Sequence, residues 1–158
     1  MPNWMSIMAL AALLALPGGA ASAATPADNG LPKSVEALME GFSWNTRPMV
    51  VFAPDAASPK LATLRQDWAL NEGEWLNRSM AMLEVRGLEA VYWNGQRLAI
   101  PAAEMHRYFA VEEGVFAILL VGYDGEVKER SQDPEILRAL FGLIDTMPIR
   151  QMEMRDSD

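Results

Sequence analysis

Residues 116–130 read FAILLVGYDGEVKER, and this stretch decides the fold. The apolar run Val115–Val121 has the length and composition of a buried strand. Asp124-Gly125 is a residue pair that tight hairpin turns favour. Glu126–Arg130 is more polar, as expected of a strand that returns along the edge of a sheet. The stretch therefore predicts an antiparallel hairpin with a buried first strand.

An amphipathic helix is expected directly after this hairpin. Asp133 is a good N-cap, and Pro134 suits the first helical position. Pro148 should stop or kink the helix, because the residue before a proline avoids the helical region. The residues that share the apolar face are Ile136, Leu137, Leu140, Phe141 and Ile144.

The earlier part of the chain predicts a strand, a helix and a second strand. Met49–Ala53 is apolar and bounded by prolines, which indicates a buried central strand. Ser58 is a suitable N-cap for the following helix, in which Gly73 should cause a bend or an end. Met80–Val85 is the second strand. The apolar face of the helix consists of Leu61, Leu64, Trp68, Trp75 and Leu76.

A hairpin and a short helix connect the two halves. Asn94-Gly95 accepts the positive φ angles of a type I′ turn, which predicts paired strands on either side of it. Pro101 opens a short helix that runs through Phe109. The resulting order, β-α-β, connection, short α, β-β-α, predicts a single α/β domain of the thioredoxin-like type, a three-layer sandwich with a mixed sheet. An unrelated α/β sandwich is the alternative.

The N-terminus has the layout of a secretory signal peptide. Residues 1–27 carry no charged side chain, and Ile7–Leu16 is an apolar run too short to span a bilayer. Ala21-Ser22-Ala23 supplies the small residues of a cleavage site. We therefore expect residues 1–23 to be a signal peptide and the protein to be periplasmic or secreted, with the membrane involved only during export. A disordered apolar tail and an uncleaved anchor are the alternatives.

Composition excludes several classes of function. The formal net charge is −8, and an acidic domain repels phosphate backbones, so nucleic-acid binding is not expected. The chain has no cysteine, which excludes a thiol oxidoreductase, a thiol peroxidase and a cysteine-ligated zinc protein. We expect no cofactor. Residues 24–41 are expected to form a linker and N-terminal extension before a domain at residues 42–155.

Several segments resemble a known family. They are RPMVVFAP at residues 47–54, RYFAV at 107–111, FAILLVGYDG at 116–125 and LFGLIDTMPIRQMEM at 140–154. The resemblance is to domain of unknown function 4174 (DUF4174), which is similar to the DUDES domain of vertebrate secreted matrix proteins. Tyr123 and Ile149 depart from the family pattern, which commonly has Lys and Met there. The resemblance implies a thioredoxin-like fold and export, but no known reaction.

Three residues are candidates for a catalytic site. Asp55 and Ser58 stand where thioredoxins proper carry their Cys-x-x-Cys motif, at the N-terminus of a helix, which can bind an anion or activate a nucleophile. The plainer interpretation is that Ser58 caps the helix and Asp55 favours the turn. His106 is the single histidine, and an exposed position on the short helix is the plainer interpretation for it.

Other residues are candidates for ligand or metal binding. Arg47, Arg107, Arg150 and Arg155 lie in the segments that carry the resemblance, close in sequence to Asp145 and Glu153. They predict either an ion pair that ties the last helix to the sheet or an arginine-lined site for a carboxylate or phosphate. Met152 and Met154 have a spacing that could hold copper(I), although methionines more often fill gaps in packing.

The hypothesis from the sequence is a non-catalytic binding module. Its partner is an unknown protein or small-molecule ligand. An enzyme with a cysteine-independent site near Asp55, Ser58 and His106 is the alternative. The charged and apolar tail after Pro148 should dock on the body of the domain through Ile149, Met152 or Met154, and docking onto a partner is the alternative.

Overall fold

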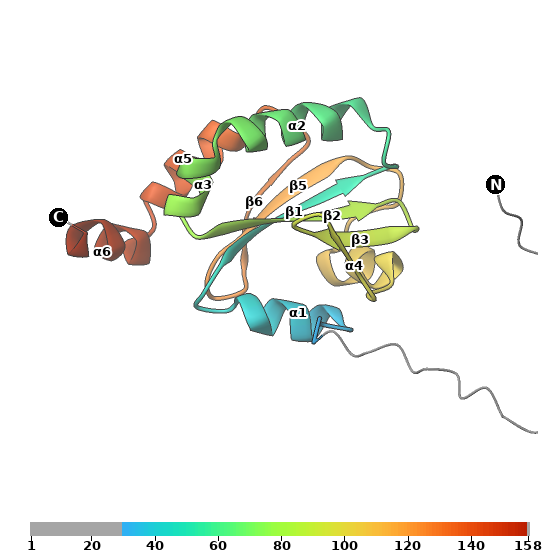
Figure 1. Cartoon of the computed structure of the whole chain (residues 1–158), viewed down its shortest axis with the longest axis horizontal. Coiled ribbons are helices and arrows are strands. Elements are labelled where there is room, and N and C mark those ends of the chain that lie inside the picture. Colours follow the sequence, from blue (N-terminus) through green and yellow to red (C-terminus); the bar gives the residue numbers. More distant parts are fainter. Residues whose placement is uncertain (1–29, 158) are drawn as a thin grey trace, which may run out of the picture.

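A six-stranded mixed β-sheet with helices on both faces forms the body of the protein, as the computed structural model shows (Figure 1). The structure describes residues 30–157. The signal peptide expected at residues 1–23 lies outside the described residues. None of the helices in the described part is long and apolar enough to cross a membrane.

The strand order across the sheet is β4-β3-β2-β1-β5-β6. The central strand β1 pairs in parallel with β2 and antiparallel with β5, so Val50 lies between Leu83 and Leu119. The remaining neighbours pair antiparallel. The strands are β1 (Arg47–Ala53), β2 (Met80–Arg86), β3 (Ala90–Trp93), β4 (Gln96–Leu98), β5 (Ala117–Val121) and β6 (Val127–Ser131).

Helices cover both faces of the sheet. Successive side chains of a strand point to opposite faces, so those of the central strand are buried on either side. All seven residues of β1 are buried. Val50 and Phe52 join a core under α1 (Val35–Phe42) and α4 (Ala102–Phe109). Met49 and Val51 join a second core under α2 (Pro59–Leu70) and α5 (Leu137–Asp145).

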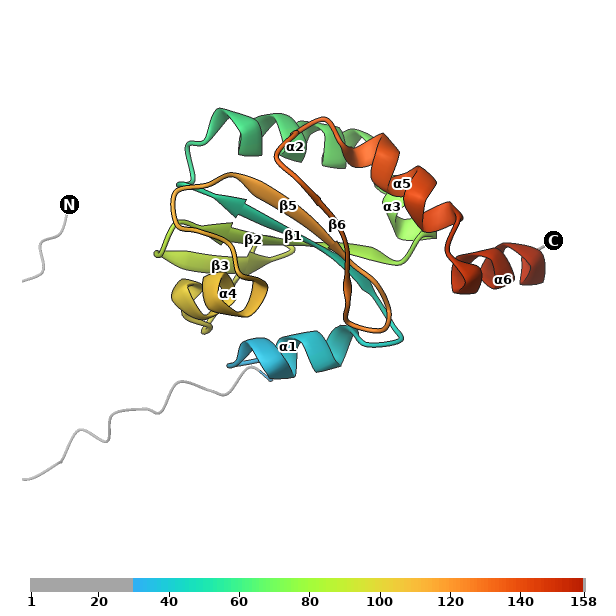
Figure 2. The ribbon, with the colours of Figure 1, turned by 180° about the vertical axis from the view of Figure 1, so that it is seen from behind.

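Figure 2 shows the two layers of helices from behind, with α1 and α4 on one face and α2, α3 and α5 on the other. This arrangement confirms the three-layer α/β sandwich that the sequence predicts. The central order β2-β1-β5-β6 is consistent with a thioredoxin-like sandwich, to which the hairpin β3–β4 is added at one edge.

Local sequence signals explain most boundaries. Asn94 and Gly95 have φ angles of 48° and 78°, which confirms the hairpin turn between β3 and β4. The Ser58 hydroxyl accepts a hydrogen bond from Leu61 N at 3.5 Å, which confirms the cap of α2. The long helix ends at Leu70, before Gly73, and α3 (Glu72–Asn77) follows.

The two ends of the domain differ from the expectation. The helix α1 packs Val35 and Phe42 into the core, so the folded body begins before residue 42. At the other end α5 begins at Leu137 rather than Pro134. The Asp133 carboxylate accepts a hydrogen bond from Glu135 N at 3.0 Å, as an N-cap does, but residues 134–136 form a turn in which Ile136 N donates to the Asp133 carbonyl, and the regular helix begins after it.

A separate helix, α6 (Pro148–Asp156), follows α5. The chain changes direction after α5, and Pro148 is the first residue of α6. At this position a backbone N–H would have no partner within the helix, so proline loses no hydrogen bond. Arg150 is the buried residue of α6, whereas Met152 is 54% exposed. The tail does return to the body, but its buried contact is made by a charged side chain rather than by the apolar ones that we expected.

Candidate functional site

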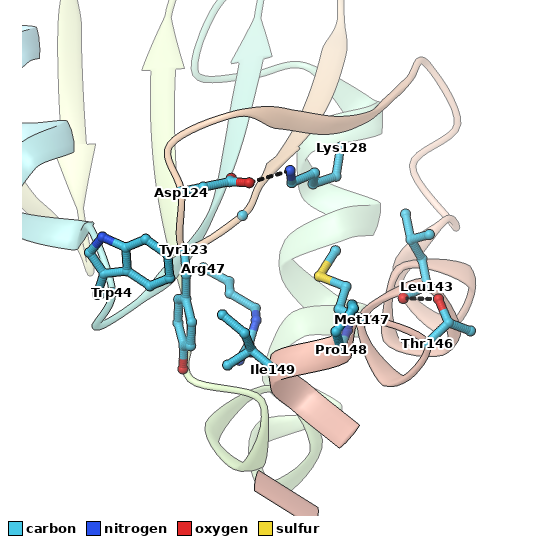
Figure 3. A pocket seen from close by; sticks show the side chains of 11 residues that line it. Trp44, Arg47, Tyr123, Asp124, Lys128, Leu143, Thr146, Met147, Pro148 and Ile149 are labelled. Carbon is cyan, nitrogen blue, oxygen red and sulfur yellow. Dashed lines mark hydrogen bonds and ion pairs between the residues drawn. The ribbon is translucent and has the colours of Figure 1, made fainter. Parts of the chain in front are cut away.

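A pocket of about 420 Å³ opens beside the start of β1, at the end of the sheet opposite to Asp55. Three segments that are distant in sequence form it: the α1–β1 loop, the β5–β6 turn and the α5–α6 junction. Figure 3 shows their side chains around the opening. Its lining consists of Trp44, Arg47, Gly122, Tyr123, Asp124, Lys128, Leu143, Thr146, Met147, Pro148 and Ile149.

Trp44 stands at the edge of this pocket in an unusual conformation. Its φ angle is 59°, in the left-handed region that bulky residues avoid. Its backbone N–H donates to the carbonyl of Tyr123 at 3.0 Å, which joins the α1–β1 loop to the β5–β6 turn. The side chain is 69% exposed. The fold therefore holds a strained backbone while leaving a large aromatic ring in solvent.

Arg47 forms the inner wall of the pocket and is only 1% exposed. Its guanidinium lies over the Tyr123 ring, with Cζ 3.7 Å from the ring centroid. Nη2 donates to Glu153 Oε1 at 3.1 Å, and Nη1 donates to the Arg78 carbonyl at 2.9 Å. The charge is thus buried, stacked and paired, which is the arrangement that a desolvated guanidinium requires.

The Arg47–Glu153 pair continues into a charge network across α3, α5 and α6. Arg78 donates to both carboxylate oxygens of Asp145, at 3.0 and 2.7 Å. Arg150 bridges Asp145 and Glu153, with Nε and Nη1 at 3.4 and 3.3 Å from their oxygens. The network thereby fixes α6 to the body beside the pocket, of which Arg47 is a wall.

Both carboxylates of this network are held in the charged form. Burial raises the pKa of Glu153, but hydrogen bonds from Arg47 and Tyr123 outweigh it, so the pKa lies below its ordinary value. The pKa of Asp145 is also lowered, because Arg78 and Arg150 outweigh the effect of burial. The network is therefore an ionic one at neutral pH.

A second, more exposed ion pair stands on the rim. Lys128 Nζ donates to Asp124 Oδ2 at 2.6 Å and to Glu126 Oε2 at 3.0 Å. The hydrogen bond from Lys128 lowers the pKa of Asp124. This rim adds a second charged group to a pocket whose inner wall is Arg47.

The structure places Asp55 and Ser58 at the opposite end of β1. Asp55 is exposed, and its carboxylate accepts from Ala57 N at 2.8 Å, as in a local turn. The Ser58 hydroxyl is used as the N-cap of α2. Among the described residues these contacts match the plainer interpretation of both side chains, and no hydrogen bond joins either of them to His106.

His106 is buried, not exposed as we expected. Its ring packs against Phe52 with centroids 4.9 Å apart. Nδ1 lies 3.0 Å from the Val111 carbonyl, and Nε2 lies 3.2 Å from the Gly87 carbonyl. His106 lies on the buried face of α4, and its ring connects the loop after α4 to the β2–β3 loop.

The arginine candidates divide into two groups. Arg47 and Arg150 meet at Glu153, whereas Arg107 and Arg155 are exposed on α4 and α6. Met152 is exposed and Met154 is half-buried. Within residues 30–157, no group of three or more His, Cys, Asp and Glu side chains is placed to hold a metal ion.

Sequence reasoning missed Trp44 and Lys128, and it noted Tyr123 only as a departure from a pattern. Trp44 carries one usable signal: it stands between the expected N-terminal extension and the strand predicted at Met49–Ala53, in a position where a large ring has no predicted face to join. The proximity of Tyr123 to Arg47 depends on strand pairing and carries no local signal.

The comparisons with known proteins agree with the resemblance. The coiled-coil domain-containing protein 80 of Danio rerio is 28% identical over 149 residues, covering 78% of this chain and 16% of that protein. The chain thus spans about a sixth of the length of this relative. No solved structure matches it. The family described as "Domain of unknown function (DUF4174)" matches residues 38–153, which is well over half of the chain. The chain therefore belongs to the DUF4174 family.

Proposed function

We propose that this protein is an exported binding domain without catalysis of its own, and that the pocket beside β1 holds its ligand. The ligand is either a small molecule or a side chain of a protein partner. Export is proposed on the uncharged, apolar N-terminal segment that ends in Ala21-Ser22-Ala23.

The observation that carries the proposal is the state of Trp44. A left-handed conformation costs a bulky residue roughly 1–2 kcal/mol. A side chain that is 69% exposed recovers little of that cost through burial. Exposed aromatic rings at the edge of a pocket are frequent anchors for ligands, because they offer a large rigid surface. A contact role for Trp44 therefore explains a feature that folding alone does not.

The surroundings of the pocket support binding rather than turnover. Its polar groups are already paired: Arg47 with Glu153, Lys128 with Asp124, and the Thr146 hydroxyl with the Leu143 carbonyl at 2.7 Å. The remaining walls are mostly apolar, formed by Met147, Pro148 and Ile149 among others. Apolar walls with a few fixed polar groups are typical of small-ligand sites.

A fragment screen by two-dimensional NMR tests the proposal. A library of neutral aromatic and aliphatic fragments should shift the Trp44 indole and the amides of Gly122, Tyr123 and Thr146. Shifts concentrated on Asp55, Ser58 and His106 would instead favour the enzymatic alternative. Sequencing the N-terminus of the protein from its native host tests export, which requires a start at or near Ala24.

A further inference from the structure

We propose that Glu153 occupies an anion site beside this pocket, at the guanidinium of its Arg47 wall, and that a ligand carrying a carboxylate on an apolar group binds by replacing it. The inference rests on the proposed function, because it names the ligand class of the same pocket. On this view α6 is a latch that the ligand opens.

Arginine nitrogens surround the Glu153 carboxylate. Arg47 presents two nitrogens to it, with Nη2 3.1 Å from Oε1 and Nη1 3.4 Å from Oε2. Arg150 Nη1 also lies 3.3 Å from Oε2, but Arg150 belongs to α6 and moves with Glu153, so the fixed part of the site is Arg47. A planar guanidinium fork opposite two oxygens is the usual recognition mode for a carboxylate. The site would accept another carboxylate in the same place.

Arg47 belongs both to the anion site and to the pocket. It binds Glu153 and also forms a wall of the pocket, together with Tyr123 and Met147. The Tyr123 ring holds the guanidinium from one side, with its centroid 3.7 Å from Cζ. A ligand whose apolar part lies in the pocket therefore has its acid group beside the Arg47 fork.

Ion pairs of Glu153 and Arg150 attach α6 to the body. The helix has nine residues and leaves α5 through the extended residue Met147. An isolated helix of that length is not stable in water, so its contacts with the body must hold it. Its buried residue is Arg150, while its apolar Ile149 and Met152 are exposed. The attachment is ionic, and Figure 1 shows α6 projecting from one end of the body.

These features together make release of α6 selective. Removing Glu153 would leave the buried charge of Arg47 without a partner, which is strongly unfavourable. The latch can therefore open readily only when another anion takes the position of Glu153. A neutral ligand of the same shape does not supply that charge. The pocket, at about 420 Å³, has room for an apolar group beside the acid.

Calorimetric titration with N-acetyl-phenylalanine and its uncharged amide tests this exchange in the purified protein. The acid should bind and the amide should bind at least about tenfold more weakly. Octanoate, titrated in parallel, distinguishes an aliphatic acid from a peptide C-terminus as the source of the carboxylate. In the wild type, the acid should also increase hydrogen exchange at the backbone amides of α6.

The decisive variant is Glu153→Gln, which keeps the shape of the side chain and removes its charge. With the internal competitor gone, the acid should bind at least about tenfold more tightly than to the wild type. Asp156→Asn is the matched control, because Asp156 is exposed on the same helix and the same charge is lost. Its affinity should equal that of the wild type.

Several results would overturn the inference. These are equal affinities for acid and amide, equal affinities of Glu153→Gln and Asp156→Asn, or no binding of either acid to Glu153→Gln. If Glu153→Gln does not fold, the wild type decides: hydrogen exchange in α6 that does not change when acid is added would also overturn the inference. Neutral fragments that bind the pocket while acid and amide bind alike would leave the proposed function standing and remove this inference alone.

Discussion

Arg47 and Glu153 are separated by 106 positions in the chain, yet they share two hydrogen bonds between the start of the central strand and the last helix. The bond runs from a side chain that is 1% exposed to one that is 30% exposed. Because the guanidinium is buried, the start of β1 is stable only when a carboxylate balances the charge of Arg47. The two residues therefore connect the stability of the sheet to the position of α6.

A double-mutant cycle on this pair should show strong coupling. Glu153→Gln or Arg47→Met alone should lower the free energy of unfolding by about 3 kcal/mol, the low end for a broken buried pair, because Glu153 is partly exposed. The double variant should lose less than the sum of the two single losses. Urea unfolding measures all four proteins, and additive losses within about 0.5 kcal/mol would contradict the coupling.

Acid should weaken the same attachment. The folded-state pKa of Glu153 and of Asp145 lies below the ordinary values of 4.5 and 3.8. The unfolded chain therefore binds protons first as the pH falls, so these groups stabilise the fold above about pH 4.5 and lose that effect as the pH falls through their folded pKa values. The melting temperature should therefore fall as the pH is lowered from about 4.5.

Glu153→Gln serves as the control for this acid effect. The difference in melting temperature between wild type and variant should be full near neutral pH and should shrink as Glu153 becomes protonated. A difference that stays constant down to about pH 3 would mean that the charge of Glu153 does not stabilise the fold.

The sequence predicted the elements whose signals are local. Two prolines bound the apolar run Met49–Ala53, and β1 is found there with every residue buried. Asn94-Gly95 predicted a hairpin, and both residues have positive φ angles. The start of α5 was missed because a turn at residues 134–136 separates Asp133, which accepts from Glu135 N as expected of a cap, from the regular helix, and a capping residue does not specify the length of such a turn.

The candidate site was less predictable, because its contacts are made across the fold. An ion pair that ties the last helix to the sheet was one of two interpretations of Arg47, Arg150 and Glu153, but which of these side chains meet depends on the direction in which Pro148 starts α6. The burial of His106 depends on which face of α4 meets the sheet, and one histidine in a short helix does not specify this. Local sequence gives residue types and periodicity, whereas this site requires the packed positions of three loops.

Two glycine-to-alanine substitutions should change stability in opposite directions. Gly87 has a φ angle of 52°, and an added Cβ would lie 2.7 Å from the Pro54 carbonyl oxygen. Gly87→Ala should therefore destabilise the fold by about 2 kcal/mol or more, through left-handed strain and a backbone clash. Gly142 is exposed within α5 with open space around its Cα, so Gly142→Ala should stabilise by up to about 1 kcal/mol. Thermal unfolding of both variants checks the signs, and a neutral Gly87→Ala would mean that the β2–β3 loop can move away from Pro54.

Trp44 should be dispensable for folding and necessary for binding. Asn tolerates the left-handed region better than Trp does, so Trp44→Asn relieves strain while losing the few contacts of a ring that is 69% exposed. The free energy of unfolding should stay within about 1 kcal/mol of the wild type. Trp68, which belongs to the second core, is the contrasting position, and Trp68→Ala should cost about 3–5 kcal/mol.

In the fragment screen, Trp44→Asn should weaken binding at the pocket while the spectrum elsewhere remains that of the folded protein. A variant that binds fragments as well as the wild type would remove Trp44 from the site, and a large loss of stability would show that its ring serves the fold instead.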